Sequence, residues 1–508
     1  MRTPSGPRPA ALLLLAAWLL APASAPAQEA EAPAPSAEAA DPWAVPPEGA
    51  CAPDGGLRVA SGDDAAAPFP FAPGDTLELA RVEALQRFLP RPLWEYRERF
   101  FYEGMRLEIG PCYRDYAPPA FFQEATARGA GRASLGSDGG LLGWEAGLAF
   151  PPGAIDPADP QAGARWAWNA ATRYQGAGLR GKFRVVDLMG RVGRAEPFEG
   201  EIFRMQLAHR ADLPERATAF AKGNWWVAGG RFFEPTNARE YAWRQYRNDE
   251  ALEKAARTDD LLAYLPTWRR VRRIPAVNVE GLYMPSFSVG VVPAQQLAVG
   301  GGAGAGAGGG GGVVSAGGVG AEGGTLQTRR SGFEGQELRP LLWDWRVIGL
   351  QDLLAPINVV SPMYPAEEQR EFGPWGLSFA SDRWDLRRAL VLEGRIKGKP
   401  GDRGEARVLW YFDLQTLVPL FYMAYDAKDE PIDVGVFASR WSEDRPDYPR
   451  WPDDPARPVR VLDTMGAAFA NLAEDGSWRR ESWDLVATPP PDKQLKQMTS
   501  STGLTKGR

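Results

Sequence analysis

Histidine is almost absent from this sequence, which has one, His209, among 508 residues. A Ser-His-Asp or Cys-His catalytic site would have to use this residue, because such sites need an imidazole as general base. Its neighbours Gln206, Leu207 and Arg210 include no nucleophile, and no Gly-x-Ser-x-Gly motif occurs in the chain. We therefore interpret His209 as a surface or strand-end residue and predict no catalytic residues.

Cysteine is also scarce, with two residues, Cys51 and Cys112. One histidine and two cysteines cannot supply the ligand set of a structural zinc site, and we predict neither a metal nor a cofactor. In an oxidising compartment an even pair of cysteines can form one disulfide, which constrains the unfolded chain by closing a long loop. The sequence favours a Cys51–Cys112 disulfide, and two free thiols are the alternative.

Long apolar runs are missing except at the N-terminus. Arg2 and Arg8 come first, an apolar run occupies residues 10–20, and small residues fill positions 21–27. This is the pattern of a secretory signal peptide, and the run is much shorter than the roughly 20 residues of a membrane-spanning helix. We predict cleavage after about Ala27 and export to the periplasm, either free or peripheral to the outer membrane.

Positive charge is not in excess. The chain has 58 Lys and Arg against 64 Asp and Glu, a formal net charge of −6. Removal of residues 1–27 takes away Arg2 and Arg8 and no acidic residue, which leaves 56 basic side chains and a net charge of −8. Binding to phosphate backbones needs a basic surface, so we predict no nucleic-acid partner.

Composition divides the chain behind the signal peptide. Residues 28–75 are rich in Ala and Pro and are expected to be a mostly disordered leader unless Cys51 anchors them. Residues 299–324 are almost entirely Gly, Ala and Val, which predicts a flexible insert with nothing to bury. We expect a single β domain over residues 76–488 that carries this insert, followed by a loose tail over residues 489–508.

The clearest strand signal lies between Arg383 and Trp441. Short β-rich runs alternate there with Gly, Pro and Asp turns, which predicts an antiparallel meander. The four runs are Ala389–Glu393, Val408–Phe412, Val418–Tyr425 and Ile432–Phe437. Further strands are predicted at Met105–Ile109, Lys182–Val186, Glu201–Ala208, Trp225–Val227, Leu261–Pro266, Trp268–Ile274, Leu341–Ile348 and Val459–Asn471.

Helices are predicted from apolar spacing and from their ends. A helix over residues 76–89 should end before Pro90, and a second amphipathic segment follows at Leu93–Glu103. Another begins at the Pro-Pro pair after Tyr116, and residues 162–176 suit a helix closed by Gly176. Residues 239–258 have mixed charge and a helical composition.

The meander strands carry apolar side chains on both faces. Such a sheet must be covered twice, by other elements or by a ligand. Core packing is one interpretation, and a lipid-sized cavity is the other, because the mouth of a curved sheet commonly holds an apolar ligand. The sequence leaves open which face would line that cavity. The candidate ligand-binding residues are Trp343, Trp345, Trp410, Phe412, Leu420, Phe421 and Met423.

Four arginines follow Trp268. In a strand Arg270 and Arg272 share one face, and Arg269 and Arg273 share the other. Four guanidinium groups so close together could clamp the phosphate or carboxylate of an anionic head group. The alternative is an exposed edge strand that its charges protect from aggregation.

A series of motifs occurs in an order that resembles a family of exported bacterial proteins, domain-of-unknown-function family thirteen-twenty-nine. The resemblance begins near Val82. The motifs are Tyr113-Arg-Asp-Tyr, Phe150-Pro-Pro-Gly, Ala167-Trp-Asn, Arg173-Tyr-x-Gly, Trp268-Arg-Arg-Val-Arg-Arg-Ile-Pro with Trp345-Arg-Val-Ile-Gly-Leu-Gln-Asp, Arg383-Trp-Asp-Leu-Arg-Arg and Tyr411-Phe-Asp-Leu-Gln-Thr-Leu. In that family His commonly follows Trp-Asn, where this chain has Ala170.

The resemblance implies an outer-membrane lipoprotein-sorting (LolA/LolB-like) fold. We therefore expect a mainly β protein with helices (α+β), in which a strongly curved antiparallel sheet forms an unclosed half-barrel plugged by helices. The implied function is a non-enzymatic carrier or accessory protein for a lipid-like hydrophobic molecule. Its implied partner is a transporter of the resistance-nodulation-division type or an outer-membrane protein.

Two other classes of function stay open. Aromatic residues beside acids, as in Trp343-Asp344-Trp345, could stack sugars in a carbohydrate-active enzyme or a glycan-binding protein. A pair of catalytic carboxylates is recognised by its separation in space, which a sequence does not give. The third possibility is a structural partner of a membrane complex.

Overall fold

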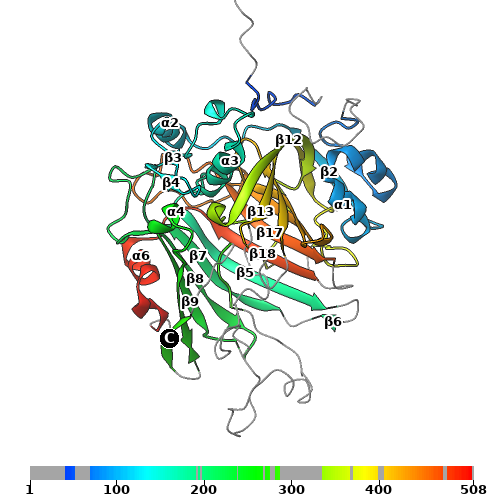
Figure 1. The fold of residues 1–508 in the computed structure, drawn as a ribbon. Helices are drawn as coiled ribbons and strands as arrows, with labels where there is room; N and C mark the ends of the chain where they lie inside the picture. The colour runs from blue at the N-terminus through cyan, green and yellow to red at the C-terminus, as the bar shows by residue number, and fades with distance from the viewer. Residues whose placement is uncertain are drawn as a thin grey trace, which may run out of the picture. The chain divides into compact units, whose positions relative to one another are not determined.

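One large β-sheet organises the chain in the computed structural model (Figure 1). The structure describes residues 41–51, 69–189, 193–194, 197–236, 238–266, 269–274, 281–285, 335–365, 370–398, 405–472 and 478–505. All of them belong to one unit, Asp41–Arg508. The predicted signal peptide and the Gly-rich insert at residues 299–324 lie outside the described residues.

The sheet contains sixteen strands in this described part of the chain. Its order is β1-β2-β13-β14-β15-β16-β17-β18-β5-β7-β8-β9-β10-β11, with β12 on β13 and β6 on β5. The first half of the chain gives β1 (Thr76–Leu77), β2 (Leu107–Cys112), β5 (Gly178–Met189), β6 (Gly193–Arg194), β7 (Phe198–Gln206), β8 (Asn224–Glu234), β9 (Ala242–Asn248), β10 (Asp260–Leu265) and β11 (Arg270–Ile274). The second half gives β12 (Trp343–Ala355), β13 (Arg383–Ile396), β14 (Arg407–Asp413), β15 (Pro419–Tyr425), β16 (Pro431–Trp441), β17 (Leu462–Asn471) and β18 (Trp478–Val486). A separate hairpin pairs β3 (Ser134–Leu135) with β4 (Leu141–Leu142).

The predicted meander is confirmed. Strands β13 to β16, which contain the four predicted runs, lie side by side in chain order and pair antiparallel. Strands β17 and β18 continue the same order, and no strand was predicted at β18. One pair departs from the antiparallel expectation: β2 runs parallel to β13, which the long intervening chain permits. Because β12 pairs with β13 along its length, β2 and β14 share the other side of β13.

The sheet is curved and unclosed. Side chains from one face of nearly every strand between β5 and β18 form a single hydrophobic cluster, together with a helix. Side chains of the opposite face form three separate clusters. Side chains converge on the inner face of a curved sheet and diverge on its outer face, so the single cluster marks the inner face. In the described ladders β12 and β11 end the sheet and do not pair with each other, which confirms the predicted open architecture.

The predicted helix at residues 162–176 is confirmed as α3 (Ala162–Ala171), which lies against β12 and β13 on the inner face (Figure 1). Trp166, Ala167 and Ala170 are buried there. The approach is close, because a Cβ atom at Gly163 would lie 2.4 Å from the carbonyl oxygen of Trp345. The helix after Tyr116 is also confirmed as α2 (Ala120–Gly129), which Pro119 precedes.

The helix predicted over residues 76–89 begins instead as β1 and continues as a 3₁₀ helix, η1 (Leu79–Phe88). The next segment forms α1 (Arg91–Glu95) and η2 (Arg97–Arg99). Side chains of η1 and α1 pack on the outer face of the meander, where Leu85 and Leu93 are buried.

The helix predicted over residues 239–258 is wrong, because the segment forms β9 and one helical turn, α4 (Glu250–Glu253). Three polar residues of this segment, Arg244, Gln245 and Arg247, are buried and have partners outside β9. Gln245 and Arg247 donate to the carboxylate of Asp259, and Arg244 donates to the carbonyl of Met498.

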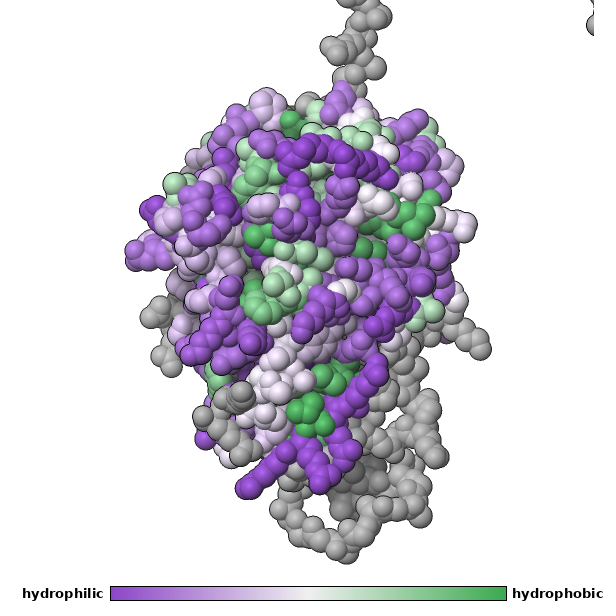
Figure 2. All heavy atoms as spheres, turned by 90° about the vertical axis from the view of Figure 1, so that its left-hand side faces the viewer, coloured by the Kyte–Doolittle hydropathy of each residue, from purple (hydrophilic) through white to green (hydrophobic). Residues whose placement is uncertain are grey.

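The C-terminal segment, expected to be a loose tail, contains α6 (Asp492–Thr499) and η8 (Ser501–Leu504). Leu495 packs against the outer side of β7 and β8, and Leu504 packs against β9 and β10. Figure 2 shows the face that carries α6, where hydrophilic side chains dominate and hydrophobic areas are small and scattered. Of the large hydrophobic side chains in the described residues, Leu142, Phe233 and Val360 are exposed.

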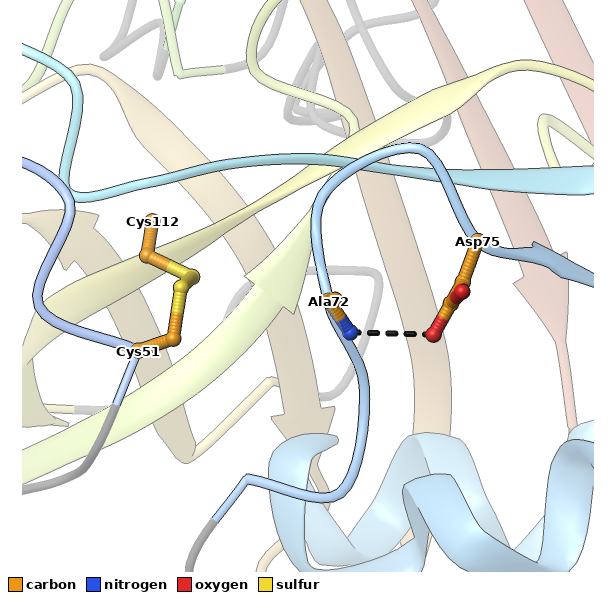
Figure 3. Close-up of a disulfide and its surroundings, with 4 residues drawn as sticks. All are labelled: Cys51, Ala72, Asp75 and Cys112. Carbon is orange, nitrogen blue, oxygen red and sulfur yellow. Dashed lines mark hydrogen bonds between the residues drawn. A yellow bond between two sulfur atoms is a disulfide. The ribbon is translucent and has the colours of Figure 1, made fainter.

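Cys51 and Cys112 form the predicted disulfide, with Cα atoms 5.3 Å apart (Figure 3). The bond ties residues 41–51 to the end of β2. Trp43 adds a second anchor, because its indole nitrogen donates to the carbonyl of Ile155 (2.6 Å) and its ring meets Trp166 edge-on. Ala72 and Asp75 close a turn next to the disulfide (Figure 3). Where the leader is described, it is therefore fixed to the domain.

None of the helices in the described ranges is long and apolar enough to cross a membrane.

Candidate functional site

Aromatic side chains of β12, β14 and β15 meet on the inner face. Trp343 and Trp345 alternate along β12, and Trp410 lies directly opposite Tyr422 in the β14–β15 ladder. The ring centroids of Trp410 and Tyr422 are 4.5 Å apart, and those of Trp343 and Trp345 are 6.3 Å apart. These four residues line a cavity of about 20 Å³, which we call the aromatic niche.

Gly394 on β13 makes room for the niche. It pairs with Trp345 on one side and Val408 on the other. A Cβ atom at Gly394 would lie 3.0 Å from both the Trp345 ring and the Val408 side chain. The missing side chain therefore allows the indole of Trp345 to lie across β13 toward β14.

Two segments outside the sheet form another part of the niche wall. Gly281 lines the niche together with Gly335, Glu337 and Leu338 of an inner segment (residues 335–339). The amide of Gly281 donates to the carbonyl of Glu337. Gly335 has a φ of +77°, and a Cβ atom there would press on Pro419 and Phe437 at 3.0–3.1 Å. Only glycine adopts this conformation without strain, so residue 335 fixes the turn into the inner segment.

Buried arginines hold the inner segment in place. Arg173 donates to the carbonyls of Gly335 (2.9 Å) and Gln336 (3.0 Å), and Arg247 donates to the carbonyl of Leu338 (3.0 Å). Burial lowers the pKa of the Arg173 guanidinium to about 10, because desolvation disfavours its charged form. These bonds satisfy backbone carbonyls that would otherwise be buried without partners.

Two carboxylates complete the anchoring. Arg204 Nε lies 2.5 Å from Glu337 Oε1. Asp259 forms ion pairs with Arg247 and Arg339. Burial of Asp259 opposes ionisation, but the two arginine charges outweigh burial and hold its pKa below the usual value. Breaking such a buried pair from one side leaves an uncompensated charge, so the inner segment is firmly attached in this conformation.

The niche is small. About 20 Å³ accommodates one or two water molecules and not a whole lipid. Trp343, Trp345 and Trp410 are buried, with 6%, 8% and 6% of their surfaces exposed. Glu405 at the niche accepts a hydrogen bond from the Tyr422 hydroxyl (2.9 Å). A long-chain ligand would have to displace the inner segment.

The structure separates the seven predicted ligand-binding residues into two groups. Trp343, Trp345, Trp410 and Phe412 lie together in the inner cluster, and the Trp410 and Phe412 rings stack at 5.5 Å. The remaining three lie in the outer cluster under the N-terminal helices and are not brought to the niche; they are Leu420, Phe421 and Met423.

The predicted anionic site lies elsewhere. Arg269 directly precedes β11, and Arg270, Arg272 and Arg273 lie on β11, which ends the described sheet far from β14 and β15 in strand order. All four side chains are exposed, and Arg273 pairs with Asp260. This arrangement agrees with the alternative of a charged edge strand.

His209 lies just beyond the end of β7, at the strand end where it was expected. Its ring stacks on Trp144 with centroids 4.4 Å apart, and its Nδ1 lies 3.0 Å from the carbonyl oxygen of Glu145. Among the described residues no group of three or more His, Cys, Asp or Glu could hold a metal ion.

A polar junction that sequence reasoning did not single out joins three of the motifs. It contains Tyr113–Tyr116, the start of β13 and the β14–β15 turn. Arg387 donates to the Asp413 carboxylate (2.7 Å), the carbonyl of Arg114 (2.6 Å) and the Gln415 side chain (3.1 Å). The motifs are visible in the sequence, but their contacts are not, because Tyr116 and Gln415 are separated by 299 positions.

Asp385 lies at the centre of this junction. Tyr116 donates its hydroxyl hydrogen to Asp385 (2.5 Å), and burial raises the pKa of the Asp385 carboxyl to about 6. A Cβ atom at Gly110 would lie 1.9 Å from Asp385 Oδ1, so glycine makes room for this side chain where β2 pairs with β13. These contacts attach β2 to the meander, which is a structural role.

The protein is therefore mostly β, with one curved, unclosed sheet and helices on its faces. The chain belongs to the family described as "Protein of unknown function (DUF1329)", whose model matches residues 97–286 and 320–447, more than half of the chain. The resemblance drawn from the motifs is thereby confirmed, although the match starts at residue 97 and not near Val82. No curated protein sequence matches the chain.

Three solved structures are distantly similar to this chain. A DUF1329 family protein from Desulfovibrio piger is 12% identical with a TM-score of 0.37, over 69% of this chain and 99% of that one. A domain assigned to outer membrane lipoprotein sorting from Vibrio parahaemolyticus is 13% identical (TM-score 0.35, 68% and 100%). A LolA superfamily protein from Nitrosomonas europaea is 10% identical (TM-score 0.28, 65% and 96%). At these TM-scores nothing about the ligand or partners of this chain follows from the similarity.

Proposed function

We propose that the protein is a non-enzymatic carrier or accessory protein that binds a lipid-like hydrophobic molecule on the inner face of its sheet. The observation that carries the proposal is the aromatic niche, where Trp343, Trp345, Trp410 and Tyr422 line a cavity on the apolar inner face. Such a concave apolar surface with a few polar groups at its edge is typical of small-molecule sites.

Ligand entry requires the inner segment to move. Transfer of an alkyl chain from water contributes about 0.8 kcal/mol per buried CH₂, so a ten-carbon chain gains roughly 8 kcal/mol. Displacement would break hydrogen bonds worth about 1 kcal/mol net each, and also the buried Arg204–Glu337 pair, whose loss costs about 3–5 kcal/mol. The gain from a long alkyl chain is of the same order as this cost, so we propose that a long-chain ligand displaces residues 335–338.

The proposed site of action is the periplasm. The basic start, the apolar run and the small residues up to Ala27 support export. The Cys51–Cys112 disulfide suits an oxidising compartment. A transporter of the resistance-nodulation-division type or an outer-membrane protein as partner rests on the family resemblance alone. N-terminal sequencing of the exported protein would locate the cleavage site.

A glycan-binding protein is the second candidate. Glu405, hydrogen-bonded to Tyr422 beside three indole rings, offers the combination of aromatic faces and a polar acceptor that suits a sugar ring. A sugar ring would also have to displace the inner segment, because the niche holds one or two water molecules, but its affinity would not depend on an alkyl chain. The two candidates therefore differ in whether affinity grows with chain length.

The test is a titration of the purified mature protein with decanol, followed by tryptophan fluorescence, and native mass spectrometry of the protein as isolated. Val408→Trp should fill the niche, because Val408 lines it, and should weaken decanol binding at least tenfold. Leu409→Trp is the matched control, because the neighbouring side chain packs on the outer face. Equal binding by both variants, or no binding of decanol to the wild type, would overturn the proposal.

A further inference from the structure

The inner segment carries a carboxylate onto the inner face of the sheet. Glu337 lines the aromatic niche, and its side chain is fully buried. Its Oε1 lies 2.5 Å from Nε of Arg204 on β7, and its Oε2 lies 3.9 Å from Nη1 of Arg247 on β9. One residue of the inner segment therefore belongs to the niche wall and also pairs with two guanidinium groups of the sheet.

Side chains outside the inner segment position these two guanidinium groups. Trp226 on β8, the strand between β7 and β9, pairs with Gln206 on one side and with Arg247 on the other. The guanidinium carbons of Arg204 and Arg247 lie 5.7 Å and 4.6 Å from the centroid of its ring. Aromatic faces attract cations at such distances. Asp259 also holds Arg247, by an ion pair of 3.0 Å. The cations are therefore built into the sheet, whereas Glu337 belongs to the inner segment.

Displacement of the inner segment would remove the counter-charge of Arg204. In the described part of the chain, Glu337 is the carboxylate that pairs with Arg204. Burial lowers the pKa of the Arg204 guanidinium, and the Glu337 carboxylate opposes this fall. Arg173 would in addition lose its acceptors, the carbonyls of Gly335 and Gln336. A buried cation without a counter-charge is costly, so an inner face without the inner segment favours an anion in place of Glu337.

A ligand with an anionic head group therefore differs from a neutral ligand of the same chain length. Both bury the same alkyl chain on the inner face. The neutral ligand leaves Arg204 without a counter-charge, whereas a carboxylate restores the ion pair that displacement breaks. Guanidinium groups suit carboxylates in particular, because their donors lie in one plane and match the two oxygens.

We propose that Arg204, with Arg173 and Arg247 beside it, binds the carboxylate head group of an anionic amphiphile, which takes the place of the Glu337 carboxylate while the chain occupies the inner face. This inference rests on the proposed function and names its class of ligand. Glu337 is then the internal occupant of the head-group site in the structure described. The exposed arginines of β11, which suggested an anionic site from the sequence, end the described sheet and are not part of this site.

The experiment compares decanoate with decanol on the full mature chain with its disulfide intact. Both probes are titrated at pH 8, where decanoate is ionised, and below the concentration at which they aggregate. Tryptophan fluorescence and calorimetry measure the affinities, and circular dichroism verifies the fold of each variant. The wild type should bind decanoate at least tenfold more tightly than decanol.

Two variants separate the head-group site from its internal occupant. Glu337→Gln weakens the attachment of the inner segment and keeps Arg204, so both probes should bind at least fivefold more tightly. The preference for decanoate should stay at tenfold or more, because it depends on the complexes from which Glu337 has been displaced. Addition of Arg204→Gln to Glu337→Gln removes the cation without leaving its partner charged, and the preference should fall to threefold or less.

The matched control adds Arg270→Gln to Glu337→Gln, because Arg270 is exposed on β11 and its replacement changes the net charge equally. It should keep the affinities of Glu337→Gln. Equal binding of decanoate and decanol by the wild type would overturn the head-group inference and leave the carrier proposal standing. A preference that survives the loss of Arg204, or that disappears with Arg270, would place the anion elsewhere and overturn the inference as well. Unchanged affinities in Glu337→Gln would overturn the role of this carboxylate as the internal occupant. If neither probe binds, the carrier proposal itself fails.

Discussion

Asp463 on β17 is a fully buried carboxyl whose pKa is raised to about 7. Burial is the main cause, and it outweighs the opposing effects of Arg445, 2.6 Å away, and of a hydrogen bond with Tyr448. Asp484, which also pairs with Arg445, adds to the rise. The folded protein therefore binds a proton at Asp463 in a pH range where the unfolded chain has released it.

A pH dependence of stability follows from this proton. Between about pH 4 and pH 7 the folded state holds more protons at Asp463 than the unfolded state does, so stability falls as the pH rises. The free energy of unfolding of the wild type, relative to Asp463→Asn, should fall with a slope of up to about 1.4 kcal/mol per pH unit and level off above pH 7. Urea unfolding of both proteins between pH 4.5 and 8 measures it.

Asp344→Asn serves as a control, because Asp344 is an exposed side chain that lies near Lys397. Its unfolding free energy should follow the wild type at every pH. Parallel curves for the wild type and Asp463→Asn would show that Asp463 is ionised in the folded state across the whole range.

At the aromatic niche, the sequence indicates the residue types but not the face of the sheet that each side chain occupies. Alternation along β15 would place Leu420 and Tyr422 on the same face. The ladder instead shifts register between Tyr411 and Phe412, so Leu420 joins Phe421 on the outer face while Tyr422 faces the niche. The aromatic content of the wall could be predicted, but a bulge changes which face a side chain occupies and leaves no clear signal in the sequence.

The elements were predictable where local chemistry determines them. The meander strands are short apolar runs that Asp and Gly turns separate, and each was expected at its place. Strand β9 was missed because its stability depends on Asp259, which satisfies Gln245 and Arg247 from outside the strand. Likewise α6 is polar, and its position depends on contacts of Met498 and Thr499 with β9. A local pattern cannot report partners that the fold brings from elsewhere.

The inner segment gives a prediction at this scale. Asp259→Asn should remove the carboxylate charge that pairs with the buried Arg247 and Arg339 and lower the free energy of unfolding by about 3–5 kcal/mol. The inner segment should also become easier to displace, so decanol should bind more tightly per folded molecule. Urea unfolding and fluorescence titration of the same variant test both consequences.

Arg91→Ala is a suitable comparison, because the Arg91–Glu95 pair is exposed on α1. Removal of a surface ion pair changes stability by less than about 1 kcal/mol. A loss at Asp259→Asn no larger than that of Arg91→Ala would mean that the inner segment does not depend on its buried ion pairs.

In the molecule as a whole, different parts of the chain cover the two faces of the sheet. The outer face is covered by N-terminal elements, α6 and η8, whereas the inner face carries α3, the inner segment and the niche. Pairing of β18 with β5 joins the second half of the chain to the first. The sequence of neither strand indicates that the other is its partner. The family resemblance supplied the curved architecture that local patterns could not.

Removal of the disulfide tests whether the two faces of the sheet are independent. It closes a loop with a sequence separation of 61 and joins residues 41–51 to β2, whose end packs in the outer cluster. By loop entropy, replacing both Cys51 and Cys112 with Ala should cost about 2–5 kcal/mol of stability. Binding of decanol by the folded variant should stay within twofold of the wild type, because the bond lies on the face opposite the niche. We would measure unfolding by urea and affinity by fluorescence on one preparation. A large loss of affinity in a variant that remains folded would mean that the two faces are coupled through β13, which carries side chains in both clusters.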